Sequence, residues 1–281
     1  MQGTIDGFHY GSVTPLAAYV MACLGAALGL RCTTRSLRTG GSWKPGWLAL
    51  GATSIGSGIW TMHFIAMIGF DVEEAPVSYD LAPTVASLAV AIVMVGVGVF
   101  TVGYRGATRT ALLSAGCLTG LGVAAMHYLG MAGMRVRGHL EYDTVAVTLS
   151  IVIAVVAATA ALWAAVSVHG FLASLGASLV MGVAVTGMHY TGMSAISVHL
   201  LDASGVSAGG SSPTSLLFPM LLGPVVFLVL AGVVVMFDPL LVLGEGEWDR
   251  PQGRPATQPR TAGAWGNVPA PRHGTQDTLD R

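Results

Sequence analysis

Long apolar stretches separated by short polar ones dominate this chain. A helix that crosses the hydrocarbon core of a bilayer needs about 20 predominantly apolar residues. Seven stretches reach or approach that length, at residues 15–30, 47–70, 81–102, 110–131, 145–168, 171–198 and 216–237. The pattern predicts an all-α, polytopic membrane protein with seven transmembrane helices. Residues 1–14 form an N-terminal segment before the first helix, 15–237 the seven-helix domain, and 238–281 a tail.

Composition supports a membrane protein and excludes nucleic acid as a partner. Hydrophobic residues make up 53% of the chain and charged residues only 10%, whereas a soluble domain carries about 25% charged residues. The mean hydropathy is +0.69. The net charge is −1, and the arginines form no basic face that could follow a phosphate backbone. The lipid bilayer is therefore the expected surrounding.

Basic residues are distributed unevenly between the two sides that seven spans define. The connections after the first and third spans and the tail hold eleven of the 13 Lys and Arg residues. Positively charged loops stay in the cytoplasm, so the N-terminus is predicted outside and the C-terminus inside. The tail is rich in Pro, Gly and Arg, which predicts a disordered cytoplasmic segment too short for an attached catalytic domain.

A motif of methionine and histidine residues recurs three times, at residues 62–67, 126–131 and 188–193. Each copy reads Met-His-aromatic-x-small-Met. The copies are almost evenly spaced, and each period contains two apolar stretches, so the chain is predicted to be three helix pairs plus a seventh helix. Alternating topology places His63, His127 and His189 at one depth, near the outer face.

Imidazole and thioether groups together suit copper. Thioether sulfur favours Cu(I), while zinc prefers Cys, His and carboxylate ligands. Histidine and the methionine four residues later share a helical face. The predicted ligands are His63, His127, His189, Met62, Met67, Met126, Met131, Met188 and Met193. A packing role is the alternative, because methionine often fills gaps and a triplication can preserve a packing motif. Haem is a further alternative cofactor, because its iron is also bound by histidine.

The three motifs resemble those of the MHYT family, a bacterial integral membrane sensor domain named after this tetrapeptide. The resemblance implies copper binding near the outer face of the bacterial plasma membrane and sensing of a diatomic gas, O2, CO or NO. On this resemblance, Tyr128 and Tyr190 are expected to be accessory residues of the metal site. The first copy departs from the pattern with Phe64 in place of tyrosine, and the threonine survives only as Thr191. Family members are often fused to cytoplasmic diguanylate cyclase, phosphodiesterase or histidine kinase domains.

A membrane sensor is thus the predicted function, and a copper-handling or small-solute transporter is the alternative. No nucleophile–base set is visible, so the chain is not expected to be an enzyme. A retinal protein is excluded, because the one lysine, Lys44, lies in a polar connection. His9 precedes the first helix and could join an outer metal site. The signal is expected to leave through a separate partner or a homo-oligomer.

Overall fold

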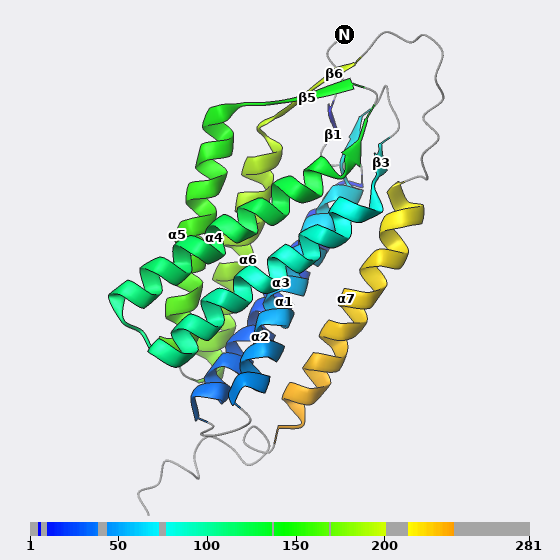
Figure 1. The fold of residues 1–281 in the computed structure, drawn as a ribbon. Helices are drawn as coiled ribbons and strands as arrows, with labels where there is room; N and C mark the ends of the chain where they lie inside the picture. Colours follow the sequence, from blue (N-terminus) through cyan, green and yellow to red (C-terminus); the bar gives the residue numbers. More distant parts are fainter. Residues whose placement is uncertain are drawn as a thin grey trace, which may run out of the picture. The chain divides into compact units, whose positions relative to one another are not determined.

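Seven helices dominate the computed structural model, as predicted (Figure 1). It describes residues 5–6, 10–38, 44–72, 77–136, 138–168, 170–200 and 213–238. The predictions for His9 and for the tail beyond Asp238 lie outside these residues. The helices are α1 (Val13–Arg38), α2 (Lys44–Ile68), α3 (Leu81–Arg105), α4 (Arg109–Ala132), α5 (Thr144–Ser167), α6 (Phe171–Met193) and α7 (Pro213–Met236).

Six of these helices are long and apolar enough to cross a membrane, and α2 is the exception. Buried residues follow one another on every turn of α2 from Leu48 to Met67, including the polar Ser54, Ser57 and Thr61. This helix packs between α1, α3 and α7. Protein neighbours rather than lipid surround it, which explains how it tolerates small and polar residues. The chain is thus an all-α, multi-pass membrane protein.

Each helix pair is bracketed by two short strands that pair with each other. The strands are β1 (Ile5–Asp6), β2 (Asp71–Val72), β3 (Ser78–Tyr79), β4 (Met134–Arg135), β5 (Gly138–Tyr142) and β6 (Ile196–Leu200). They form three antiparallel two-stranded sheets, β1–β2, β3–β4 and β5–β6. The repeating unit is therefore strand–helix–helix–strand. All these strands lie at one end of the helices, which we call the strand end (Figure 1).

These strands were not predicted from the sequence, and the predicted sixth helix was too long. That helix was expected to reach residue 198, but α6 ends at Met193 and β6 begins at Ile196. In β6, the buried Ile196 and Val198 alternate with the more exposed Ser197 and His199. This period of two is the strand signal, but over so few residues it looked like the continuation of an apolar helix.

The first six helices close into a ring, and α7 stands outside it. Contacts join each helix to the next from α1 to α6, and α6 returns to α1. The seventh helix packs against α1, α2 and β3. At the end opposite the strands, which we call the loop end, Arg35 of α1 forms an ion pair of 2.7 Å with Asp238, just beyond α7. The seventh helix is therefore anchored to the first repeat.

Basic residues mark the loop end, as the charge pattern predicted. Three of them lie over aromatic rings: Arg31 over Phe171, Arg35 over Trp47 and Lys44 over Tyr104, at 5.2, 5.6 and 4.9 Å. Of the basic residues in the described ranges, Arg135 alone lies at the strand end. This asymmetry agrees with a cytoplasmic loop end, although which side faces the cytoplasm stays a prediction.

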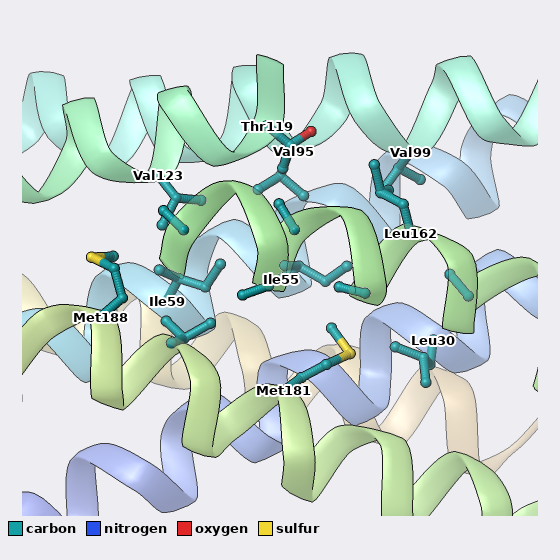
Figure 2. Close-up of a pocket in the computed structure, with 16 residues that line it drawn as sticks. Leu30, Ile55, Ile59, Val95, Val99, Thr119, Val123, Leu162, Met181 and Met188 are labelled. Carbon is teal, nitrogen blue, oxygen red and sulfur yellow. The ribbon is translucent and has the colours of Figure 1, made fainter. Parts of the chain in front are cut away.

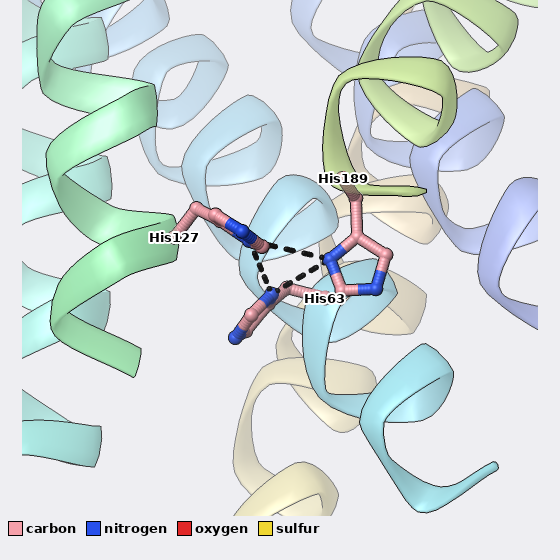
Figure 3. A group of neighbouring side chains, drawn as sticks. All are labelled: His63, His127 and His189. Carbon is pink, nitrogen blue, oxygen red and sulfur yellow. Dashed lines mark hydrogen bonds between the residues drawn. The ribbon is translucent and has the colours of Figure 1, made fainter. Parts of the chain in front are cut away.

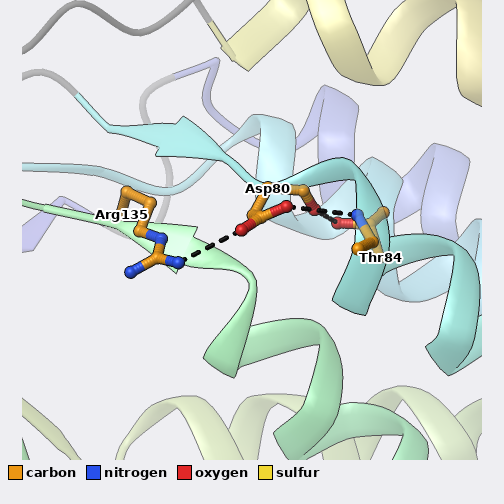
Figure 4. A network of polar contacts seen from close by, with 4 residues as sticks. Asp80, Thr84 and Arg135 are labelled. Carbon is orange, nitrogen blue, oxygen red and sulfur yellow. Dashed lines mark hydrogen bonds and ion pairs between the residues drawn. The ribbon is translucent and has the colours of Figure 1, made fainter.

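At the strand end, Asp80 holds the start of α3 through a helix cap and an ion pair. The Asp80 carboxylate accepts from the Ala82 N–H and thereby caps α3, and it forms an ion pair of 3.1 Å with Arg135 (Figure 4). These contacts lower the pKa of Asp80, first through the hydrogen bond from Arg135. The Asp80 N–H also donates to the Gly133 carbonyl at 2.8 Å. The start of α3 is thus tied to the end of α4.

Candidate metal centre

Three imidazoles converge between α2, α4 and α6, near the strand end. The Nδ1 atoms of His63, His127 and His189 form a triangle with sides of 3.0, 3.2 and 3.3 Å (Figure 3). All three side chains are buried. The predicted convergence of these rings from three repeats is therefore confirmed. Their service as metal ligands stays a prediction.

Each repeat supports its histidine in the same way. The aromatic residue that follows the histidine meets the imidazole edge to face: Phe64 on His63, Tyr128 on His127 and Tyr190 on His189. The ring centroids are 4.6 to 5.0 Å apart. Since the first copy does this with phenylalanine, the phenol is not needed for the packing.

The small residue of the motif makes room for the imidazole of the preceding repeat. A Cβ atom added to Gly130 would lie 2.6 Å from Nε2 of His63, and one added to Gly192 would overlap Nε2 of His127. Each glycine comes three residues after the histidine of its own repeat. The repeats are therefore interlocked, with one contributing an imidazole and the next the gap that receives it. The motif shows that this position is small, but the imidazole contact that requires a small residue was not predicted.

The triangle cannot be satisfied by hydrogen bonds alone. A neutral imidazole carries one N–H donor and one acceptor nitrogen. If one ring donates from Nδ1, the Nδ1 lone pairs of the other two rings face each other. If His63 or His127 is protonated on Nε2 instead, that donor has no acceptor. Nε2 of His63 and Nε2 of His127 are buried without a hydrogen-bond partner. Buried polar groups are rarely left unpaired, so these atoms call for an explanation.

A cation shared by the three Nδ1 atoms fits the observed distances. Metal–imidazole bonds are about 2.0–2.1 Å long, and ligands at two corners of a tetrahedron then lie about 3.3 Å apart. The sides of the triangle match that separation. The donor set is chemically suitable for copper, zinc, iron or nickel, because imidazole binds all four. The residues present therefore fit a metal ion.

The predicted sulfur ligands are less clearly placed. Met62, Met67, Met126, Met131 and Met188 are buried, whereas Met193 is half-buried. Met188 lines an apolar cavity beside the site. Among the accessory residues, Tyr128 is engaged elsewhere, since its hydroxyl lies 2.7 Å from that of Ser150 on α5. The hydroxyl of Tyr190 is buried. The role of the methionines and of both tyrosines stays a prediction.

Comparison with known proteins identifies the family. Residues 56–115 and 120–178 match MHYT, described as a bacterial signalling protein N-terminal repeat. The bifunctional diguanylate cyclase/cyclic di-GMP phosphodiesterase MucR of Pseudomonas aeruginosa is 37% identical over 206 residues, 72% of this chain and 30% of MucR. The cyclic di-GMP phosphodiesterase NbdA of the same species is 36% identical over 69% of this chain and 26% of NbdA.

A more distant relative shows the same pattern. The signalling protein YkoW of Bacillus subtilis is 30% identical over 68% of this chain and 24% of YkoW. The chain thus spans less than a third of the length of these relatives. No solved structure matches it. With repeated motifs on three converging helices, two matched repeats and signalling relatives, the chain belongs to the MHYT family.

Proposed function

We propose that this chain is a membrane sensor whose receptor site is a copper centre held by His63, His127 and His189. The observation that supports it is the triangle of three Nδ1 atoms with sides of 3.0 to 3.3 Å. The membrane signalling role follows from the family and its relatives. The copper and the ligand sensed are the proposal.

Thioether groups favour copper over the other metals. The six motif methionines are the proposed additional donors: Met62, Met67, Met126, Met131, Met188 and Met193. Neutral imidazole and thioether add no charge to a low-dielectric interior, where charge burial is costly. A Cu(I) ion bound there would offer an open position to a diatomic gas such as O2, CO or NO. The protein's own part is to hold the imidazoles at fixed distances and to exclude water.

Haem is a poorer fit than a single ion. The two axial ligands of a haem iron lie on opposite faces of the porphyrin. The three nitrogens touch one another, so no two of them could ligate one haem iron from opposite faces, and a haem would use only one of the three histidines. Ion transport is likewise disfavoured, because aliphatic side chains border the space on the loop side of the histidines and provide no polar path for a cation.

The sensing site can be tested by metal analysis of the purified protein in nanodiscs. Wild type is expected to bind copper, and replacing His63, His127 and His189 by Ala is expected to abolish binding. Cys117→Ala is the control, because this cysteine lies exposed on the same helix as His127. Copper at wild-type stoichiometry in the triple variant would contradict the proposal and restore the packing explanation.

For the signal output, we propose a path through α7 at the loop end. Its end is tied to α1 by the pair of Arg35 and Asp238, and it stands outside the threefold repeat. MucR is a diguanylate cyclase and cyclic di-GMP phosphodiesterase, and NbdA is a cyclic di-GMP phosphodiesterase. Cyclic di-GMP turnover by a partner protein, reached directly or through a homo-oligomer of this chain, is therefore the first output to examine. Asp238→Asn is expected to alter the cellular cyclic di-GMP response to the gas while copper content stays unchanged. An unaltered response would exclude this path.

A further inference from the structure

An apolar cavity of ≈ 50 Å³ lies among the six ring helices, on the loop side of the three histidines (Figure 2). Each motif helix contributes the residues four and eight positions before its histidine, and α6 also contributes Met188. The repeated positions are Ile59 and Ile55 on α2, Val123 and Thr119 on α4, and Val185 and Met181 on α6. With 3.6 residues per turn, these positions share the face of the histidines. The cavity therefore begins about one helical turn from the imidazoles.

The lining excludes charged and strongly polar ligands. Apart from one hydroxyl it consists of Val, Leu, Ile, Ala and Met side chains. The hydroxyl belongs to Thr119, which donates to the Met94 carbonyl at 3.3 Å. A buried water needs two to four polar partners, and apolar cavities without them stay dry. The chemistry that matches this lining is that of a small, uncharged, apolar molecule.

The size of the cavity narrows the class of possible ligands further. On the same measure, one water occupies about 10–15 Å³. The cavity volume of ≈ 50 Å³ therefore corresponds to about three to five waters. That is enough for one or a few diatomic molecules or a xenon atom. A sugar, nucleotide or other polar metabolite is excluded by the lining, and a porphyrin by the volume.

The side of α5 and α6 offers access from the bilayer. The lining residues of α1 to α4 are buried, whereas the four half-buried ones all lie on α5 and α6: Ala157, Ala161, Met181 and Val185. Two of them are alanines, which leave more room than any larger side chain. Neighbouring side chains on these helices, including Val156 and Val183, are exposed and face lipid in a membrane. The four half-buried residues are therefore the lining residues that a solute dissolved in the acyl chains could contact.

We infer that the cavity is a binding site for small apolar gases, which enter from the lipid between α5 and α6 and are held one turn from the three histidines. Non-polar gases are more soluble in hydrocarbon than in water, so the bilayer would concentrate them at this entrance. A link to signalling rests on the proposed function. Gas binding itself does not, because no histidine lines the cavity and Met188 is the one proposed copper donor among the lining residues.

Xenon is the probe, since it is apolar, monatomic and unable to ligate copper. Wild-type protein in nanodiscs is expected to show one saturable xenon site by 129Xe NMR, and xenon-pressurised crystals should place it among these residues. Ala158→Leu fills the cavity from a buried position and is expected to abolish the site. Ala160→Leu is the matched control, because Ala160 is exposed on the same helix and its variant should bind xenon normally.

Further variants separate the possible failures. If Ala158→Leu does not fold, Ala161→Leu replaces it, with the same expected loss of xenon. The variant with all three histidines replaced should lose copper yet keep the xenon site, so failure of the copper proposal leaves this inference intact. An absent xenon site, equal binding by the filled variants, ordered water in the cavity, or an acyl chain or detergent tail occupying it would each overturn the inference.

Discussion

Two layers of the same three helices differ in how strictly the repeat is kept. In the histidine layer, the buried imidazole and its aromatic neighbour recur in all three repeats, and the glycine gap recurs in the second and third. One and two turns away, in the cavity layer, the equivalent side chains vary. They are Ile59, Val123 and Val185 at one level and Ile55, Thr119 and Met181 at the next.

The difference reflects what each side chain contacts. In the histidine layer each imidazole touches the two equivalent imidazoles, so a change in one repeat disturbs all three. In the cavity layer the side chains border a shared space. Cores tolerate hydrophobic exchange when total volume is kept, so apolarity and volume suffice there. Residue identity is therefore constrained in the histidine layer, whereas only apolarity and total volume are constrained in the cavity layer.

The largest expected contrast is in metal binding. His127→Ala removes one corner of the triangle and should weaken copper binding by more than the about 10–100-fold typical of losing an outer-shell partner. Val123→Ala, one turn away on the same helix, should leave copper affinity unchanged while lowering stability. Competition titration with a chromophoric Cu(I) chelator measures both. Equal losses would mean that the two layers are not functionally distinct.

The gaps that receive the imidazoles should be nearly as sensitive. Gly130→Ala and Gly192→Ala place a methyl group against Nε2 of His63 or His127, and overpacking of this kind costs about 1–3 kcal/mol. The thermal unfolding temperature and the copper content of both variants should be lower than in wild type.

Gly187→Ala is the control for this prediction. It lies on α6, and an added Cβ would have no neighbour within 4 Å. Because alanine favours helix over glycine by about 1 kcal/mol, this variant should be neutral or slightly stabilising. Equal destabilisation by all three variants would show that helix context, not the imidazole contact, decides the outcome.

Exchanges between repeats in the cavity layer should have smaller effects. Val123→Ile and Ile59→Val each bring in a residue already found at an equivalent position, and together they keep the total volume. Such swaps usually cost less than about 1.5 kcal/mol. The double variant should unfold near the wild-type temperature and retain its copper. A loss of copper in the double variant would show that the cavity layer helps to position the histidines.

The two layers also differ in how far the sequence predicts them. The recurring motif with its even spacing was sufficient to predict three converging histidines, because equivalent positions in repeats occupy equivalent depths. No local pattern marks the cavity, since Ile55, Thr119 and Met181 share no residue type and become neighbours only through helix packing. The strands escaped for a related reason: several contain two residues, too few to establish a period.

The smallest expected effect lies in the ion pair beyond the histidine layer, at the strand end. Asp80→Asn keeps the cap on α3, because asparagine caps helices about as well as aspartate, and removes the charge that faces Arg135. Asp143→Asn on α5 is the control, since that cap has no cationic partner in the described part of the chain.

The sign of the pH dependence follows from the lowered pKa of Asp80. Its contribution to stability is fully present above its ordinary pKa of 3.8 and is lost as the pH falls through the lowered value. The Asp80→Asn variant should therefore unfold at a slightly lower temperature than wild type at pH 7, and the gap should close in acid. Added salt should also narrow it, because exposed charges are screened. A gap of the same size at both pH values would show that the cap, rather than the charge, holds this end of the repeat together.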